Sequence, residues 1–197
     1  MSIIQDGAGR SYSAKVTDSQ RLLTKSLTLS EFSNATEIGD GYNLNTGIIT
    51  LTADSDTAVA FFKYTGSKTF VLSNIAVGLG TAQGAVSNPA KITLIKNPTT
   101  GNIISDATAG DMNVNRSFSS TNTLSGNFYK GAAGKTFGNG TDAAIFFAGA
   151  GSRLFATIDF DLNQNNSIGI SIDPNCDSGF VAYVAFIGFE KTPETDL

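Results

Sequence analysis

The residues best suited to chemistry are two aspartates at alternate positions, Asp159 and Asp161, which Asn163 follows at the same spacing. Oxygen ligands in the order D-x-D-x-N are typical of a calcium-binding loop. Such a loop also needs a glycine at its sixth position and a glutamate at its twelfth, where this sequence has Gln164 and Ile170. We therefore interpret the aspartates as the solvent-facing side of a strand that runs into a turn, and we expect no metal or other cofactor.

Catalytic side chains of other kinds are scarce. The 197 residues include no histidine and a single cysteine, Cys176, which excludes Ser-His-Asp and Cys-His nucleophiles and imidazole zinc sites. The glycine-rich segments "YKGAAGKT" and "GLGTAQG" miss the P-loop and dinucleotide fingerprints, because Tyr129 and Gln83 occupy positions that require glycine. A hydrolase that works with carboxylates alone is the remaining catalytic class. We expect a protein that is not an enzyme.

The elements that carry the aspartates are predicted to be strands. In residues 153–162, "RLFATIDFDL", apolar side chains recur at every second position, and residues 167–173, "SIGISID", do the same after a short Asn-rich turn. Phe155 and the two aspartates fall on the other, more polar face of the first segment. Two alternating runs on either side of a short turn predict a β-hairpin with one face in the core and one in water.

The same alternation predicts further strands at residues 25–32, 47–53, 58–64, 69–79, 91–96, 143–147 and 180–190. All four prolines lie between these strands, as hydrogen bonding within a sheet requires. We predict an all-β fold, an antiparallel β-sandwich of jelly-roll type formed by residues 26–197. Residues 105–142 have few strand features and are either an extended loop or a pair of weak strands; long loops are common interaction surfaces.

Residues 1–25 differ from the rest and are predicted to be an extended N-terminal attachment arm. Residues 1–30 carry four basic and two acidic side chains, although the whole chain has a net charge of −4. A mildly basic arm thus precedes an acidic body, and this balance argues against a nucleic-acid partner. The arm residues expected to bind a partner are Arg10, Tyr12, Lys15, Val16, Arg21, Leu22, Leu23 and Lys25.

The location of the chain is predicted from two further features. No run of residues approaches the roughly 18 apolar positions of a membrane span, so we expect no membrane association. The N-terminus has neither the basic nor the hydrophobic region of a secretory signal, and Cys176 has no second cysteine to pair with. We therefore expect synthesis in a reducing cytoplasm.

The segment "FVAYVAFIGFE", residues 180–190, is apolar on both faces of its predicted strand. Within an antiparallel sandwich one face packs on the core, and the second face needs another cover. Either a second subunit or the chain's own arm or loop can supply it. For the first alternative, the predicted interface residues are Val181, Tyr183, Ile187 and Phe189.

Several segments resemble structural proteins of tailed-bacteriophage virions. Residues 14–26, "AKVTDSQRLLTKS", are similar to the short extended arm of such proteins, in which a lysine-valine pair precedes an arginine-leucine pair. The blocks "NATEIGDGYNLNTGIITLT" (residues 34–52), "IAVGLG" (75–80), "ITLIKNPTTGNII" (92–104) and "GSRLFATIDF" (151–160) are similar to a set of small phage structural proteins. The resemblance extends over residues 9–190.

This resemblance implies a virion component that is assembled in the host cytoplasm, and capsid decoration (cement) proteins are the best match. Such proteins are β-rich, are commonly homotrimers, and bind the major capsid protein on the outer shell. The arm would then cross between capsid subunits, with its basic residues against carboxylates of the shell. An alternative function is an adhesion module that binds a host surface polysaccharide, which predicts exposed aromatic side chains within residues 105–142.

Overall fold

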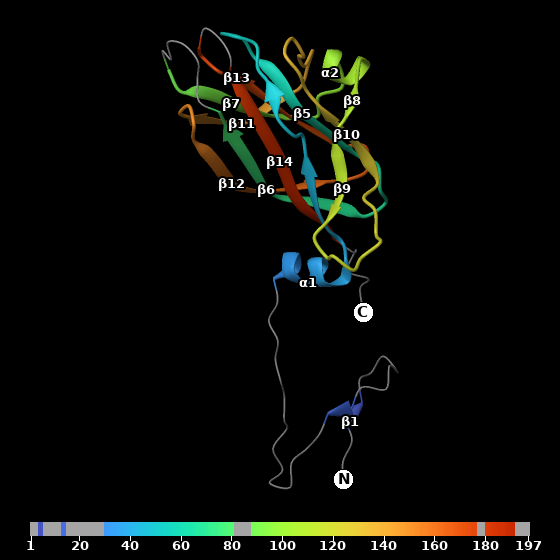
Figure 1. The fold of residues 1–197 in the computed structure, drawn as a ribbon. Coiled ribbons are helices and arrows are strands. Elements are labelled where there is room, and N and C mark those ends of the chain that lie inside the picture. The colour runs from blue at the N-terminus through green and yellow to red at the C-terminus, as the bar shows by residue number, and fades with distance from the viewer. Residues whose placement is uncertain (1–3, 6–12, 15–29, 81–87, 177–179, 192–197) are drawn as a thin grey trace. The chain divides into compact units, whose positions relative to one another are not determined.

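The chain divides into two units, residues 1–30 and residues 31–197. The computed structural model describes residues 4–5, 13–14, 30–80, 88–176 and 180–191 (Figure 1). In the first unit, β1 (Ile4–Gln5) pairs antiparallel with β2 (Ser13–Ala14). The eight arm residues expected to bind a partner all lie outside the described residues.

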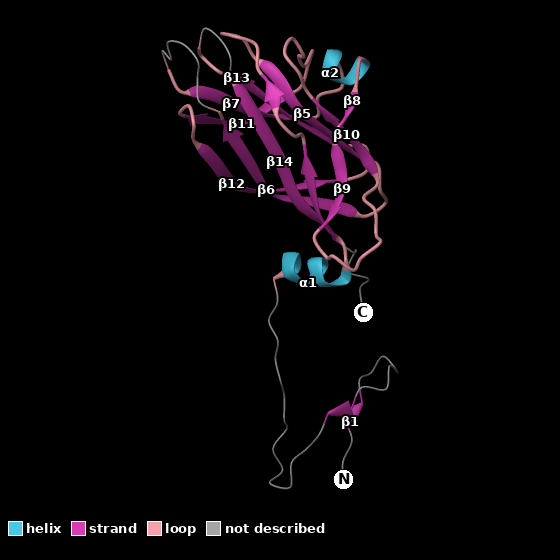
Figure 2. Ribbon diagram, in the orientation of Figure 1, coloured by secondary structure: helices cyan, strands magenta, loops and turns pink. Residues whose placement is uncertain are grey.

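The second unit is a β-sandwich of two antiparallel sheets (Figure 2). The first, which we call the β14 sheet, has the strand order β12-β6-β14-β3-β9, and β4 also pairs with β14. Its strands are β3 (Gly41–Asn45), β4 (Ile49–Thr50), β6 (Thr69–Leu79), β9 (Asp111–Asn115), β12 (Arg153–Leu162) and β14 (Val181–Lys191). The prediction of an all-β antiparallel sandwich is confirmed; the jelly-roll arrangement stays a prediction.

The second sheet, which we call the β13 sheet, has the strand order β11-β7-β13-β5-β10-β8. Its strands are β5 (Thr57–Tyr64), β7 (Ala90–Lys96), β8 (Thr108–Ala109), β10 (Gly126–Lys130), β11 (Thr141–Ala148) and β13 (Ser167–Asp173). The short helix α2 (Asn102–Ser105) lies at the end of the sandwich opposite the helix α1 (Glu31–Ile38).

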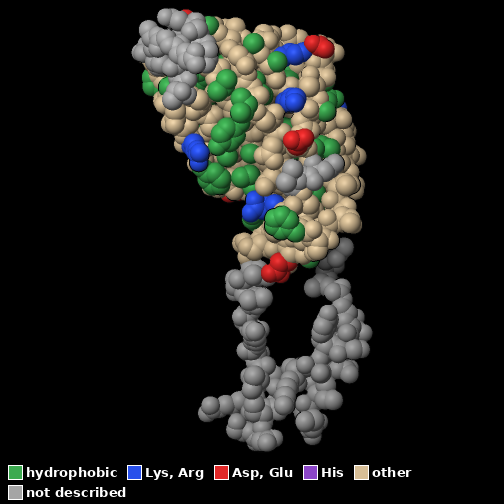
Figure 3. All heavy atoms as spheres, in the orientation of Figure 1, with side chains coloured by type: hydrophobic (Ala, Val, Ile, Leu, Met, Phe, Trp, Pro, Cys, Tyr) green, Lys and Arg blue, Asp and Glu red, His purple; other side chains and the backbone are tan. Residues whose placement is uncertain are grey.

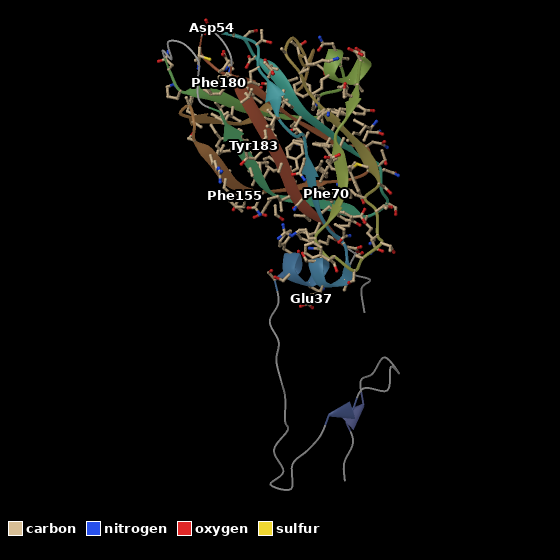
Figure 4. All side chains as sticks on the ribbon, in the orientation of Figure 1. Glu37, Asp54, Phe70, Phe155, Phe180 and Tyr183 are labelled. Atoms are coloured by element: carbon tan, nitrogen blue, oxygen red, sulfur yellow. The ribbon has the colours of Figure 1, made fainter. Side chains whose placement is uncertain are left out.

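The core lies between the two sheets and is built by the alternation read from the sequence. Every second side chain of β13 is a fully or almost fully buried isoleucine, and β14 contributes Ala182, Val184 and Phe186 from the facing sheet. The rings of Phe62 and Phe70 meet edge to face with centroids 5.2 Å apart, an arrangement that adds to the burial of their apolar area. Phe70 and Phe180 are marked in Figure 4.

The predicted hairpin of residues 153–162 and 167–173 is wrong. β12 pairs with β6 at the edge of the β14 sheet, whereas β13 lies between β5 and β7 in the β13 sheet. The Asn-rich turn between them crosses from one sheet to the other, and Asn165 in it adopts a positive φ of 68°. Two strands that each have one apolar face can pair side by side in one sheet or face one another across the core. Both arrangements bury the same side chains, so the sequence pattern does not distinguish them.

The strand predicted at residues 25–32 is also wrong in its described part, because Glu31 begins α1. Phe32 and Ala35, three positions apart, share one face of this helix and pack on Val71 and Phe189 of the β14 sheet. The helix ends at Ile38, and the φ of +88° at the next residue, Gly39, suits a residue without a Cβ. The structure therefore divides the chain five residues later than the predicted arm boundary.

Most other predicted strands agree with the structure to within about two residues, and β6 matches its predicted range. The strand predicted at 47–53 shrinks to β4, and β3 was not predicted. Residues 105–142 contain three short strands, β8, β9 and β10, as well as loops. No helix within the described residues is long and apolar enough to cross a membrane.

Candidate interaction surface

The outward face of the β14 sheet carries the predicted interface residues of its central strand. Because alternate residues of β14 point into the core, Val181, Tyr183, Ala185 and Ile187 point away from it, and Tyr183 remains 40% exposed. Figure 3 shows hydrophobic side chains gathered on this face, and Figure 4 marks Tyr183 among them.

The ring of Tyr183 lies over Gly78 of the neighbouring strand β6, which is its pairing partner. A Cβ on Gly78 would come within 1.9 Å of the Tyr183 ring, so only glycine leaves room for the ring in this position. On the other side of β6, Arg153 of β12 pairs with the same glycine. The absent side chain therefore lets a large aromatic ring pack against the sheet at this row.

The next row of the sheet has a similar arrangement. Phe155 of β12 is opposite Ala76 of β6, which is opposite Ala185 of β14. Phe155 is 65% exposed, and the small neighbouring side chains leave its ring uncovered. The outer apolar strip, as we call it, consists of Ala76, Gly78, Phe155, Val181, Tyr183, Ala185 and Ile187.

The strip ends in a polar row. Ile187 pairs with Asn74 of β6 and Asn43 of β3, and the hydroxyl of Thr157 donates a hydrogen bond to Asn74 Oδ1 over 2.9 Å. The alternation places Phe155 on the solvent-facing side of its strand, but Phe155 is not among the predicted interface residues. The signal that would have identified Phe155 is an aromatic side chain that alternates with Thr and Asp on the solvent-facing side of a strand.

Phe189 does not belong to the exposed strip, which corrects its assignment to the subunit interface. It is 5% exposed, and its ring meets the edge of the Phe32 ring with centroids 5.8 Å apart. The guanidinium of Arg116 covers Phe32 in turn, 4.8 Å from the ring centroid. At this end of β14 the chain's own helix supplies the second cover, while Val181, Tyr183 and Ile187 are left without it.

A half-buried charged cluster fixes the sandwich beside α1. Lys68 Nζ lies 2.7 Å from Asp40 Oδ2 and 3.7 Å from Glu190 Oε2. The hydroxyl of Tyr64 donates a 2.7 Å hydrogen bond to Glu190 Oε1, and Asn122 Nδ2 donates to Asp40 Oδ1 over 3.0 Å. The hydrogen bond to Asp40 is the main reason that the pKa of Lys68 is raised. We call these five residues the Lys68 cluster.

Tyr42 lies close to this cluster but does not join its hydrogen bonds. Its side chain is fully buried, and its hydroxyl has no hydrogen-bond partner among the described residues. Burial, followed by the charges of Glu190 and Asp40, raises the pKa of Tyr42 to about 12. Burial and the hydrogen bond to Glu190 also raise the pKa of Tyr64.

These shifts predict a loss of stability in alkali. A tyrosine whose pKa is higher in the folded protein keeps its full contribution below its ordinary pKa of about 10 and loses it as the pH rises toward the folded value. We expect Tyr42→Phe to unfold with the wild-type free energy at neutral pH, because no hydrogen bond is lost, and to be about 2 kcal/mol more stable than wild type near pH 12. Urea unfolding at both pH values measures this.

Tyr64→Phe is the matched control, because it removes the hydrogen bond to Glu190 and is expected to lose about 1–3 kcal/mol already at neutral pH. If Tyr42→Phe loses as much as Tyr64→Phe at neutral pH, the Tyr42 hydroxyl has a stabilising partner and the expectation is wrong.

Aromatic residues within 105–142 differ widely in exposure. Phe118 is fully exposed in a loop, whereas Phe128 is buried. Tyr129 stacks on Phe61 with ring centroids 5.5 Å apart, and Phe137 packs against the same ring. The adhesion alternative predicts exposed aromatic side chains within residues 105–142, and Phe118 is such a side chain.

The two aspartates at alternate positions lie on the solvent-facing side of their strand, as the sequence predicts. Asp159 and Asp161 are exposed on β12, which is followed by a turn in which the amide of Asn163 donates to Asn166 Oδ1. Over the described ranges, His, Cys, Asp and Glu side chains form no group of three or more that could hold a metal ion.

No protein-family model, no curated protein and no solved structure matches the chain. The resemblance to phage virion proteins therefore depends on the sequence segments within residues 9–190.

Proposed function

We propose that the protein is a non-enzymatic structural protein of a bacteriophage virion, a decoration subunit that binds the major capsid protein on the outer shell. The resemblance of residues 9–190 to small phage structural proteins supports this function. So does the basic character of residues 1–30, which suits an attachment arm that meets acidic groups on the shell.

The outer apolar strip is the observation that carries the proposal. Phe155 and Tyr183 project from β12 and β14, which pair with β6 on its two sides, so their positions are fixed before a partner binds. Contiguous exposed apolar surface on a soluble domain marks interaction sites, and rigid aromatic side chains are frequent anchors of interfaces. We assign the strip to the contact between copies of the chain, which assemble as a homotrimer around the capsid symmetry axis.

Substitution of the two anchors tests the subunit contact. We expect Phe155→Asp and Tyr183→Asp each to weaken self-association by about thirtyfold or more, because a buried carboxylate without a partner replaces an aromatic anchor. Light scattering coupled to size exclusion should give three times the monomer mass for wild type and the monomer mass for the variants. Circular dichroism should be unchanged, since both side chains are exposed.

Phe118→Asp provides the matched control, because Phe118 is exposed but lies outside the strip. It should associate like wild type. A trimer that survives both strip substitutions, or a wild-type monomer at all concentrations, would contradict the assignment of the strip.

Placement on the virion has a separate test. Antibodies against the protein are expected to label the outer shell of particles of the phage that encodes it in electron micrographs. Labelling confined to the tail would move the protein to another virion component, and unlabelled particles would reject the function.

A further inference from the structure

A small pocket opens on the outer face of the β13 sheet, the face that the proposed function does not use. Its volume is about 200 Å³. Side chains from three adjacent strands form its floor, and the loop of residues 131–140 forms one wall. The polar and aromatic residues that line it include Asp56, Lys91, Thr93, Phe137, Asp142 and Ser171.

The floor contains a hydroxyl without a partner. Thr93 lies between Ile92 and Leu94 on β7, and since both of these pack in the core, the side chain of Thr93 faces the pocket. Thr93 is 3% exposed, and within the described residues its Oγ1 makes no hydrogen bond. Its pairing partner on β13, Ser171, is also buried and lines the pocket. A buried hydroxyl left unpaired is costly, so a ligand that pairs with it gains affinity.

The aromatic wall is held rigidly in place. Gly169 of β13 allows the Phe137 ring to approach, because a Cβ there would lie 2.4 Å from the ring. The loop is tied to α2 by Asn102, whose Nδ2 donates to the carbonyl of Gly134 over 2.9 Å and whose Oδ1 accepts from the amide of Thr136 over 2.6 Å. The wall is therefore preorganised, which lowers the entropic cost of binding.

The rim is charged but has no strong preference for anions. Lys91 Nζ lies 3.6 Å from Asp56 Oδ2, a loose and partly exposed pair, and Asp142 of β11 adds a second carboxylate. Two carboxylates and one ammonium disfavour a phosphate or another anion, while these polar side chains, together with Thr136 of the loop, disfavour a purely apolar ligand.

We propose that this pocket binds one residue of a saccharide. Each sugar hydroxyl both donates and accepts, which matches a lining of carboxylates, an ammonium and two buried hydroxyls. The apolar C–H face of a pyranose ring would pack on Phe137. A volume of about 200 Å³ holds roughly seven waters at liquid density, so the site accommodates a single sugar residue with the remaining chain in solvent.

This site is independent of capsid decoration. It gives the alternative function, adhesion to a host polysaccharide, a location on the sheet opposite the outer apolar strip. The two functions can fail separately, because the strip substitutions leave the pocket unchanged and the pocket substitutions leave the strip unchanged.

The test is titration of the isotope-labelled protein with methyl glycosides of glucose, galactose, mannose and N-acetylglucosamine, followed by NMR of the backbone amides. We expect at least one glycoside to shift the amides of Thr93, Ser171 and Phe137. Asp142→Asn should weaken that binding about tenfold or more, and Thr93→Val about five- to tenfold.

Thr93→Val distinguishes binding from folding. Valine has the shape of threonine, and the hydroxyl it removes makes no hydrogen bond to any residue that the structure describes, so the thermal stability should be equal to or above that of wild type while saccharide binding falls. Thr50→Val on the β14 sheet, where Thr50 is exposed, should leave binding unchanged. Absence of amide shifts with all four glycosides, or shifts that Thr93→Val and Asp142→Asn leave intact, would overturn the proposal.

Discussion

Gly131→Ala is expected to lower the free energy of unfolding by about 3–4 kcal/mol, the largest effect of any single methyl group that we consider. Gly131 follows β10, and its amide donates a 2.9 Å hydrogen bond to the carbonyl of Val59. A Cβ on it would lie 1.8 Å from the carbonyl oxygen of Ala58 and 2.8 Å from the Cα of Val59. These are backbone atoms of β5, which β13 and β10 hold from both sides.

The strand cannot yield as a flexible side chain would, so β10 must separate from β5 at this point. The loss then combines overpacking with a broken hydrogen bond between the strands. Urea unfolding at neutral pH measures the difference. Gly149→Ala is the control, since nothing lies within 4 Å of its Cβ position and its φ is not positive; it should change stability by less than about 0.5 kcal/mol. Equal stability of the two variants would contradict this expectation, because it would show that β10 can shift away from β5 without a loss of stability.

Lys68→Met is expected to cost about 2–3 kcal/mol. The side chains of Asp40 and Glu190 are only 9% and 11% exposed, and removal of the ammonium leaves two carboxylates facing one another without their shared cation. Breaking a fully buried ion pair costs about 3–5 kcal/mol, and we take a smaller value because the Lys68 side chain is 34% exposed and water screens it.

Lys191→Met is the comparison. Its ion pair with Glu31 has an N–O distance of 3.1 Å, but both side chains are well exposed, so the loss should stay below about 1 kcal/mol. Chemical unfolding of both variants at the same ionic strength measures the difference. If Lys68→Met costs no more than Lys191→Met, the Lys68 cluster does not stabilise this end of the sandwich.

The sequence predicts the strands well where one face is apolar and turns are marked. The bounds of β6 and β13 can be predicted from the alternation of their side chains. The pairing of the strands cannot, because alternation specifies which face of a strand is buried and not which strand lies beside it. The turn after β12 has the same composition whether the chain stays within one sheet or crosses to the other. α1 was missed because the pair Phe32 and Ala35 is too short a signal to distinguish a helix from a strand end.

The candidate surfaces were predicted only in part. The two apolar faces of residues 180–190 indicated an outward patch, but the covering of Phe189 by α1 depends on a helix that was not predicted. Gly78 and Tyr183 are 105 positions apart, and Asp40, Lys68 and Glu190 come from three separate elements. Thr93 looks like an ordinary strand residue in the sequence; only its unpaired hydroxyl within a pocket distinguishes it.

The ion pair of Glu31 and Lys191 joins the first residue of α1 to the last residue of β14. The sandwich therefore begins and ends at one pole, and α2 with the loop it holds lies at the other (Figure 1). Domains with neighbouring termini can be inserted into a loop of a host protein as a self-contained module. In such a module the pole that carries α2 stays open to solution. The host segments that join the module at the α1 pole can change in length or sequence without disturbing either sheet.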